Sequence, residues 1–125
     1  MAQGSEGVPP MTHKVLVCGG RNYDDWVRVD SVLDRIHRVR RITHLIHGDA
    51  PGADRLGGSW ARKRSVQVVA CPANWSSYGN GAGPIRNERM AELGPDLVVA
   101  FPGGTGTASM RLIAEAAGIP VEVIS

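Results

Sequence analysis

The chain has 125 residues, of which 42% are hydrophobic and 21% are charged, a balance typical of one globular domain in water. Its 14 basic and 12 acidic residues leave a formal net charge of +2, which does not imply a surface that attracts polyanions in general. The sequence contains no apolar run of about 18 residues, so it predicts neither a membrane span nor a membrane partner.

The first twelve residues differ in composition from the rest. Glycine, serine, glutamate and proline are frequent there, and the apolar core of a signal peptide is missing. We therefore expect a disordered tail over 1–12 and one domain over 13–125. Cys18 and Cys71 have no CxxC partner, which favours free thiols in a reducing cytoplasm and predicts no metal site.

Apolar runs recur along the domain, with helical patterns between them. The runs predict strands over 14–18, 42–47, 66–71, 96–101 and 120–124. Asp24 or Asp25 is positioned to cap a helix whose inner face carries Trp26, Val29, Val32, Leu33, Ile36 and Val39. Further helices are expected over 52–64, 84–93 and 105–117, the last with Ala108, Leu112 and Ala116 at helical spacing. Residues 72–83 form a long predicted connection.

The predicted strands are apolar throughout instead of alternating, which is typical of parallel strands buried on both faces. With right-handed crossovers, the predicted class is α/β: a single Rossmann-like doubly wound domain with helices on both faces of a five-stranded, mostly parallel sheet. The expected strand order is 3-2-1-4-5. Ligands of such sheets bind beyond the carboxyl ends of the strands, here at the switch between the first and fourth strands.

The loop after the fourth strand has the composition of a phosphate site. It contains Gly103, Gly104, Thr105, Gly106 and Thr107, directly before a predicted helix. Glycine lets a ligand approach the backbone, and the unpaired N–H groups of a helix start favour an anion. We predict that these amides and the Thr107 hydroxyl hold a phosphate. An ordinary glycine-rich turn with Thr105 as the helix cap is the alternative.

The loop after the first strand adds a cation. Gly19 and Gly20 admit a ligand close to the backbone, and Arg21, followed by Asn22, offers a forked guanidinium for a phosphate or carboxylate. The alternative is that Arg21 and Asn22 close a turn and pair with one of the aspartates at 24 and 25.

The loop after the second strand carries Gly48 and a carboxylate, Asp49. A carboxylate at this place accepts hydrogen bonds from ribose in dinucleotide folds, so Asp49 is a candidate ribose ligand, with a structural role as the equal alternative. Asp54 falls in the first turn of the next helix, where a carboxylate stabilises the helix, and we assign it mainly a structural role. His47 at the strand end is interpreted as a core histidine.

Arg86 and Asn87 open the third predicted helix. Arg86 and Arg89 share one helix face, and two guanidinium groups near a helix start indicate an anion close by. Pairing of these arginines with Glu88 or Glu92 is the alternative.

Other side chains leave two interpretations open. Trp75 and Tyr78 are candidates to stack on a base or to cover the edge of the sheet. The basic clusters over 35–41 and 62–64 are interpreted as solvated helix ends, with contact to nucleic acid as a second possibility.

Four ordered motifs together resemble the YspA-type family of the SLOG superfamily. They are Val-Cys-Gly-Gly-Arg-Asn-Tyr (17–23), His-Gly-Asp-Ala-Pro-Gly-Ala-Asp (47–54), Gly-Pro-Ile-Arg-Asn (83–87) and Phe-Pro-Gly-Gly-Thr-Gly-Thr (101–107). The resemblance covers the chain from residue 13 onward. This superfamily is Rossmann-like and includes the Smf/DprA DNA-processing proteins and the lonely-guy phosphoribohydrolases, so the resemblance implies that a nucleotide or its derivative is bound or processed.

The lonely-guy enzymes cleave the N-glycosidic bond of nucleoside monophosphates with a Pro-Gly-Gly-x-Gly-Thr-x-x-Glu motif. Its first six positions match residues 102–107, but Met110 stands at the position of the glutamate. The arginine of these enzymes corresponds to Arg89 or Arg86, and their neighbouring lysine to Met90. Because a thioether cannot replace a carboxylate, the resemblance implies phosphate binding without this hydrolase chemistry.

These observations favour a small module that binds or senses a nucleotide or nucleotide-derived ligand, with no further cofactor. An enzyme that cleaves a nucleotide N-glycosidic bond is the alternative, with Asp49 or Glu88 as its carboxylate. Single-stranded nucleic-acid binding through the basic clusters is a third hypothesis. Because the last strand ends the chain, such a module is expected to report to a second subunit or a protein partner.

Overall fold

The computed structural model describes residues 12–125, so the predicted tail lies outside the described residues except for Thr12. A five-stranded sheet forms the centre, in the order β3-β2-β1-β4-β5, and every neighbouring pair is parallel. The predicted class and strand order are confirmed. The strands are β1 (Lys14–Cys18), β2 (His44–His47), β3 (Gln67–Ala70), β4 (Leu97–Ala100) and β5 (Val121–Val123).

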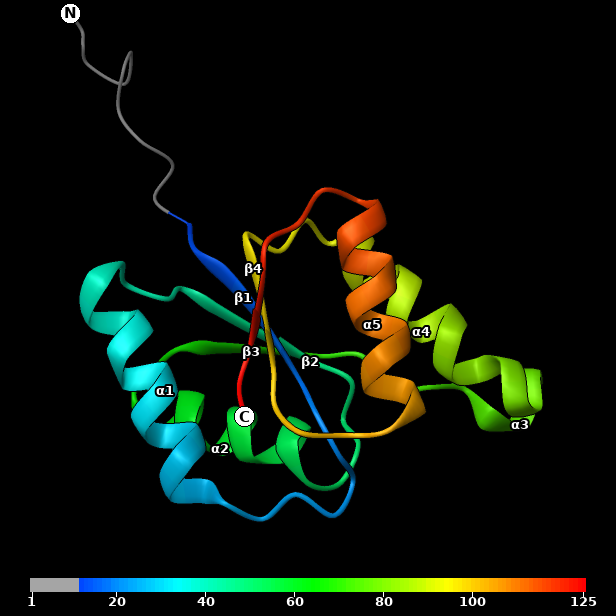
Figure 1. The fold of residues 1–125 in the computed structure, drawn as a ribbon, viewed down its shortest axis with the longest axis horizontal. Coiled ribbons are helices and arrows are strands. Elements are labelled where there is room, and N and C mark those ends of the chain that lie inside the picture. Colours follow the sequence, from blue (N-terminus) through cyan, green and yellow to red (C-terminus); the bar gives the residue numbers. More distant parts are fainter. Residues whose placement is uncertain (1–11) are drawn as a thin grey trace, which may run out of the picture.

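Helices cover both faces of the sheet (Figure 1). On one face α1 (Trp26–Val39) and α2 (Ala53–Lys63) pack against Val15 and Val17 of the central strand. On the other face α4 (Ala82–Glu92) and α5 (Thr105–Ala116) pack against Leu16 and Cys18. Successive β1 side chains thus enter opposite cores, which is why this strand is apolar at every buried position.

The helix bounds agree with the predicted ones to within about two residues, but Trp26 and Val39, expected on the inner face of α1, are exposed. Asp25 caps α1 as expected, its carboxylate accepting the Arg28 N–H at 3.0 Å. Trp26 and Val39, the first and last residues of α1, are 58% and 87% exposed. In α5 the buried residues are Thr107, Met110 and Ala114, while the predicted row of Ala108, Leu112 and Ala116 faces outward.

The connection between β3 and α4 is more regular than predicted. It contains a short helix, α3 (Trp75–Tyr78), and a single 3₁₀ turn, η1 (Gly79–Gly81). The Asn74 side chain caps α3 by accepting the Ser77 N–H at 3.2 Å. Pro84 lies in the first turn of α4, where its missing N–H costs no hydrogen bond. Within residues 12–125, none of the helices has the length and apolar composition that crossing a bilayer requires.

Candidate functional site

A cleft of about 860 Å³ opens at the carboxyl ends of β1 and β4, within the size range of small-molecule sites (roughly 300–1,000 Å³). The structure brings most of the predicted site residues together in its walls: Gly19, Gly20, Arg21, Asn22, Arg86, Asn87, Gly103, Gly104, Thr105, Gly106 and Thr107. Gly48 and Asp49 lie instead in an adjoining hollow of about 300 Å³, which shares Arg21, Trp75 and Arg86 with the cleft.

Gly20 joins the loops around the cleft through its backbone. Its N–H donates to Pro102 O at 2.8 Å, and its carbonyl accepts the Tyr23 N–H and the Ala53 N–H, each at 3.2 Å. Gly52, just before α2, has φ +82°, and a Cβ there would overlap the Gly20 carbonyl. Glycine is therefore required at 52 both for its left-handed backbone and for this close approach.

The glycine loop leaves the start of α5 open to the cleft. Gly104 is the N-cap residue, with φ −103°, and no side chain caps the helix. Thr105 is the first helical residue, so the alternative in which Thr105 caps the helix is not observed. The first helical hydrogen bond runs from Ala108 N to Gly104 O at 3.0 Å. Among the described residues, the N–H groups of Thr105, Gly106 and Thr107 have no acceptor.

The glycines of this loop have different surroundings. A Cβ on Gly103 would overlap Thr107 Oγ1 and approach Gly20 N, so glycine at 103 is needed for packing. A Cβ on Gly104 or Gly106 would meet no neighbouring atom within 4 Å. Packing among the described residues therefore does not explain glycine at 104 and 106, and both line the cleft.

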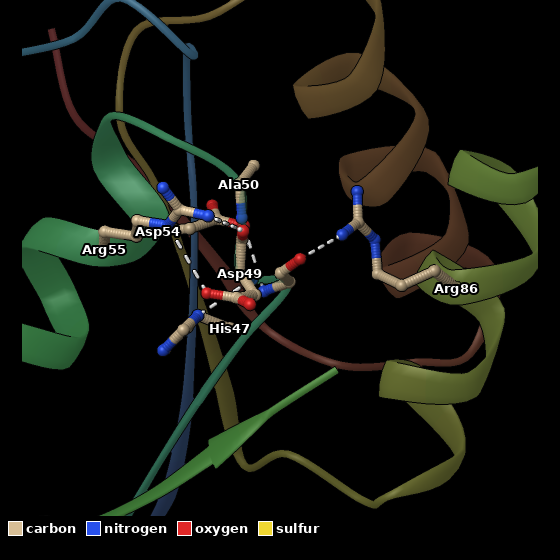
Figure 2. Close-up of polar contacts among 7 residues, drawn as sticks. His47, Asp49, Ala50, Asp54, Arg55 and Arg86 are labelled. Atoms are coloured by element: carbon tan, nitrogen blue, oxygen red, sulfur yellow. Dashed lines mark hydrogen bonds and ion pairs between the residues drawn. The ribbon is translucent and has the colours of Figure 1, made fainter. Parts of the chain in front are cut away.

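Two arginines provide positive charge at the cleft. Arg21 forms no ion pair among the described residues, so the alternative of pairing with Asp24 or Asp25 is not realised. Arg86 extends from α4 to the loop after β2, where its guanidinium donates to Gly48 O (Figure 2). Its Nε donates to Asn87 Oδ1 at 3.0 Å. Arg89 lies outside the cleft, with its guanidinium 5.9 Å from the Tyr78 ring centroid.

Asn87 is 4% exposed and connects the two helices on its side of the sheet. Its Nδ2 donates to Gly106 O at 3.3 Å and lies 3.5 Å from Ser109 Oγ, while its Oδ1 accepts from Arg86. The side chain thus positions both the arginine and the first turn of α5. This is a supporting role in addition to its place in the cleft wall.

The loop after β2 is organised by two buried side chains (Figure 2). His47 Nδ1 accepts the Asp49 N–H at 2.9 Å, and burial lowers the pKa of this imidazole. Asp54 Oδ2 accepts the Gly48 N–H at 2.9 Å and the Ala50 N–H at 3.3 Å. Burial raises the pKa of Asp54 against the opposing effects of these hydrogen bonds and of Arg86. The interpretation of His47 as a core histidine agrees with this structure.

The two candidate carboxylates of the alternative enzyme hypothesis, Asp49 and Glu88, do not line the cleft. Asp49 has φ +57° and points toward Arg55, with 3.4 Å between Asp49 Oδ1 and Arg55 Nε. Glu88 is exposed on α4 and does not line the cleft. Met110, at the position of the lonely-guy glutamate, is buried in the core between the sheet and α5.

Other cleft residues were not predicted as part of the site. Asp54, Asn80 and Ser109 line the cleft, and Trp75, which had two interpretations, forms part of its wall with 52% exposure. Asp54 reaches the cleft because the start of α2 is held beside the loop after β1 by the hydrogen bond from Ala53 N–H to Gly20 O. The spacing of residues in the sequence did not reveal this contact. Cys18 also lies at the cleft, but burial raises the pKa of its thiol to about 12, so it is a protonated, weak nucleophile.

Residues 13–78 match the sequence profile of a family described as the YspA, cpYpsA-related SLOG family. The Gene 61 protein of Mycobacterium phage D29 is 35% identical in an alignment of 116 residues, and the match covers 86% of this chain and 93% of the phage protein. The chain belongs to this SLOG family. The resemblance inferred from the four motifs is therefore confirmed.

A solved relative of this SLOG chain shows the same fold. DNA processing protein A (DprA) from Streptococcus pneumoniae superposes with a TM-score of 0.73 and 18% sequence identity. The match covers 91% of this chain but 50% of DprA, so the chain spans about half the length of that protein. Within the described residues, no three His, Cys, Asp or Glu side chains gather as a metal site requires.

Proposed function

We propose that this protein binds a nucleotide or nucleotide-derived ligand in the cleft, with a phosphate at the start of α5. The observation that carries the proposal is the uncapped N-terminus of this 12-residue helix, open to the cleft beside two glycines that packing does not require. Free N–H groups and the helix dipole favour an anion there. Arg21 supplies a cation that no carboxylate of the described residues neutralises.

The cleft also suits the rest of a nucleotide. Its volume of about 860 Å³ exceeds what a phosphate alone would fill, and the half-exposed Trp75 offers an aromatic face on which a base can stack. Membership of the SLOG family supports the proposal. The structural relative is a DNA processing protein with a chain of about twice the length, so it adds only a general link to nucleic-acid chemistry.

Calorimetry tests this function directly. Purified protein is titrated with inorganic phosphate, the four common nucleoside monophosphates and NAD, and small molecules released from the denatured protein are identified by mass spectrometry. We expect saturable binding of at least one phosphate-bearing compound. Absence of binding by every compound, with no phosphate-bearing molecule released, would contradict the proposal.

Gly104→Val provides the matched structural test. The added side chain enters the space beside the open N–H groups, so we expect nucleotide affinity to fall by at least about tenfold, a loss of the size that charged hydrogen bonds contribute. Stability should change little, because a Cβ at 104 meets no neighbouring atom and φ is negative there. Ala108→Val, on the exposed face one turn further along α5, is the control. Equal affinities for the two variants would identify the glycine loop as a simple turn.

A further inference from the structure

Asp54 is an acidic group enclosed in the cleft wall. Asp54 lies in the first turn of α2, and although the residue is only 6% exposed, it lines the cleft. Every other residue in the described cleft wall is neutral or basic. This makes Asp54 the cleft group best suited to accept hydrogen bonds from a ligand.

The two oxygens of this carboxylate have different surroundings. Oδ2 accepts the N–H groups of Gly48 and Ala50, at 2.9 and 3.3 Å, and so holds the loop after β2 in place (Figure 2). Oδ1 has no hydrogen-bond partner among the described residues. Because Oδ1 is not among the fully buried, unpaired side-chain atoms of the described residues, it stays accessible, and a donor from the ligand or from water can reach it.

The cleft wall carries charges of both signs. The open N–H groups of α5 and the Arg21 guanidinium favour the phosphate, whereas the Asp54 carboxylate repels it. Arg86 and Asp54 bond to the carbonyl and the N–H of the same residue, Gly48, which fixes their mutual position. A group that donates hydrogen bonds suits the free oxygen of Asp54, and in a nucleotide the ribose hydroxyls have this character.

We propose that Asp54 Oδ1 accepts a hydrogen bond from a ribose hydroxyl, so that the cleft selects ribonucleotides over their deoxy counterparts. The proposal rests on the nucleotide-binding function above and assigns the sugar contact to Asp54 instead of Asp49. It gives one carboxylate two tasks, in which Oδ2 orders the loop and Oδ1 binds the ligand.

The test compares sugars that differ by one hydroxyl. Calorimetry is done with AMP, 2′-deoxy-AMP, 3′-deoxy-AMP and ribose 5-phosphate, the last of which removes any contribution from the base. For the wild-type protein we expect at least one deoxy compound to bind about tenfold or more weakly than AMP, as the loss of a hydrogen bond to a charged group implies. Equal binding of AMP and both deoxy compounds would overturn the proposal.

Asp54→Asn isolates the ligand contact from the loop contact. Its amide oxygen can still accept the N–H groups of Gly48 and Ala50, while its NH₂ group replaces Oδ1 and removes the acceptor. We expect the ratio of AMP to deoxy-AMP affinity to fall to nearly one. Glu92→Gln, which removes an exposed carboxylate at the end of α4, should keep the wild-type ratio and controls for net charge.

Two further results separate the possible failures. If Asp49→Asn equalises the affinities and Asp54→Asn does not, the sugar contact belongs to Asp49 and the proposal is wrong. If AMP and deoxy-AMP bind equally well and Gly104→Val abolishes both, phosphate binding stands and only the Asp54 proposal fails. If none of these four compounds binds, the same sugar comparison is made with the phosphate-bearing compound that the wider titration identifies, and if that titration finds none, the proposed function fails together with the Asp54 proposal.

Discussion

Burial lowers the pKa of His47, the last residue of β2 before the loop beside the cleft. The imidazole is 3% exposed and uses Nδ1 as an acceptor for the Asp49 N–H. Protonation would remove this acceptor and place a charge in the core, so the fold favours the neutral ring. His37 is a parallel case, since burial lowers its pKa and its Nδ1 accepts the Ile42 N–H at 2.9 Å.

These histidines predict a pH dependence of stability. Since the pKa of each ring is lower in the folded protein than its ordinary value of about 6.5, the unfolded chain binds more protons as the pH falls. The stabilisation is complete above about pH 6.5 and is lost as the pH falls through the folded-state pKa. Urea midpoints measured between pH 7.5 and about pH 5 should decrease accordingly.

His47→Asn identifies the contribution of this residue. Asparagine can place an oxygen near the position of Nδ1 but carries no titrating group, so the variant should show a smaller decrease between these pH values, the remainder coming from His37. Comparing the two proteins also cancels the opposite contribution of Asp54, whose pKa burial raises. An unchanged pH slope would show that His47 is not responsible.

At the scale of elements, Asp34 connects the two helices on one face of the sheet. From α1 its Oδ1 accepts the Trp60 Nε1–H of α2 at 2.9 Å, and its two oxygens accept two N–H groups of Arg64, each at 2.8 Å. The hydrogen bond from Arg64 is the main reason that the pKa of Asp34 is lowered. Trp60 is fully buried, so its N–H depends on this carboxylate.

Asp34→Ala should therefore lower the free energy of unfolding by about 1–3 kcal/mol, because the buried indole N–H loses its acceptor. The matched control is Asp30→Ala, which breaks a 2.7 Å ion pair between the same two helices, to Lys63, whose side chain is half-exposed. That change should cost less than about 1 kcal/mol. Urea unfolding of both variants measures the difference, and equal losses would assign no special role to the Trp60 bond.

The arrangement of elements was more predictable than their exposed faces. Five apolar runs with helices between them predicted a parallel sheet covered on both faces, and the strand order was the one expected of a Rossmann-like doubly wound domain. The periodicity of α5 did not distinguish the row of Leu112 from that of Met110, since both rows have helical spacing. Which row is buried depends on how the helix lies on the sheet, and this is a tertiary property.

The same limit applies to the site. Glycine and arginine at the strand ends indicated the loops that line the cleft, because a doubly wound sheet brings those ends together. The choice between Asp49 and Asp54 needed the turn itself, in which Asp49 takes φ +57° and directs its carboxylate toward Arg55. Asp54 serves the fold and also reaches the cleft, and sequence reasoning assigned it only the first task.

At the scale of the whole molecule, the core argues against hydrolase chemistry. Met110 is 1% exposed and packs with Leu16 and Ile46, so a carboxylate at this position would be buried away from the cleft. We expect no appreciable release of free base from nucleoside monophosphates, as measured by chromatography. Met110→Glu should add no activity and should destabilise the fold by about 3 kcal/mol or more. Robust base release by the unmodified protein would support the alternative enzyme hypothesis.

The basic clusters contribute less free charge than their sequence suggests. Arg64 pairs with Asp34, Lys63 with Asp30 and Arg35 with Glu122, so three of these cations already have partners within the fold. This agrees with their interpretation as helix-end cations. Single-stranded nucleic acid would have to compete with these carboxylates.

The backbone hydrogen bonds of Gly20 couple the motions of the loops around the cleft. One residue holds Pro102 on one side and Ala53 on the other, so neither neighbouring loop can move far without breaking a hydrogen bond to the same backbone. Deuterium exchange at the Gly20 and Ala53 amides should accordingly proceed at similar rates and respond together to denaturant, as expected for one cooperative opening. Widely different protection of these two amides would instead indicate loops that fluctuate independently. If the loops open together, one opening step would control the entry of any ligand, whichever wall of the cleft it contacted first.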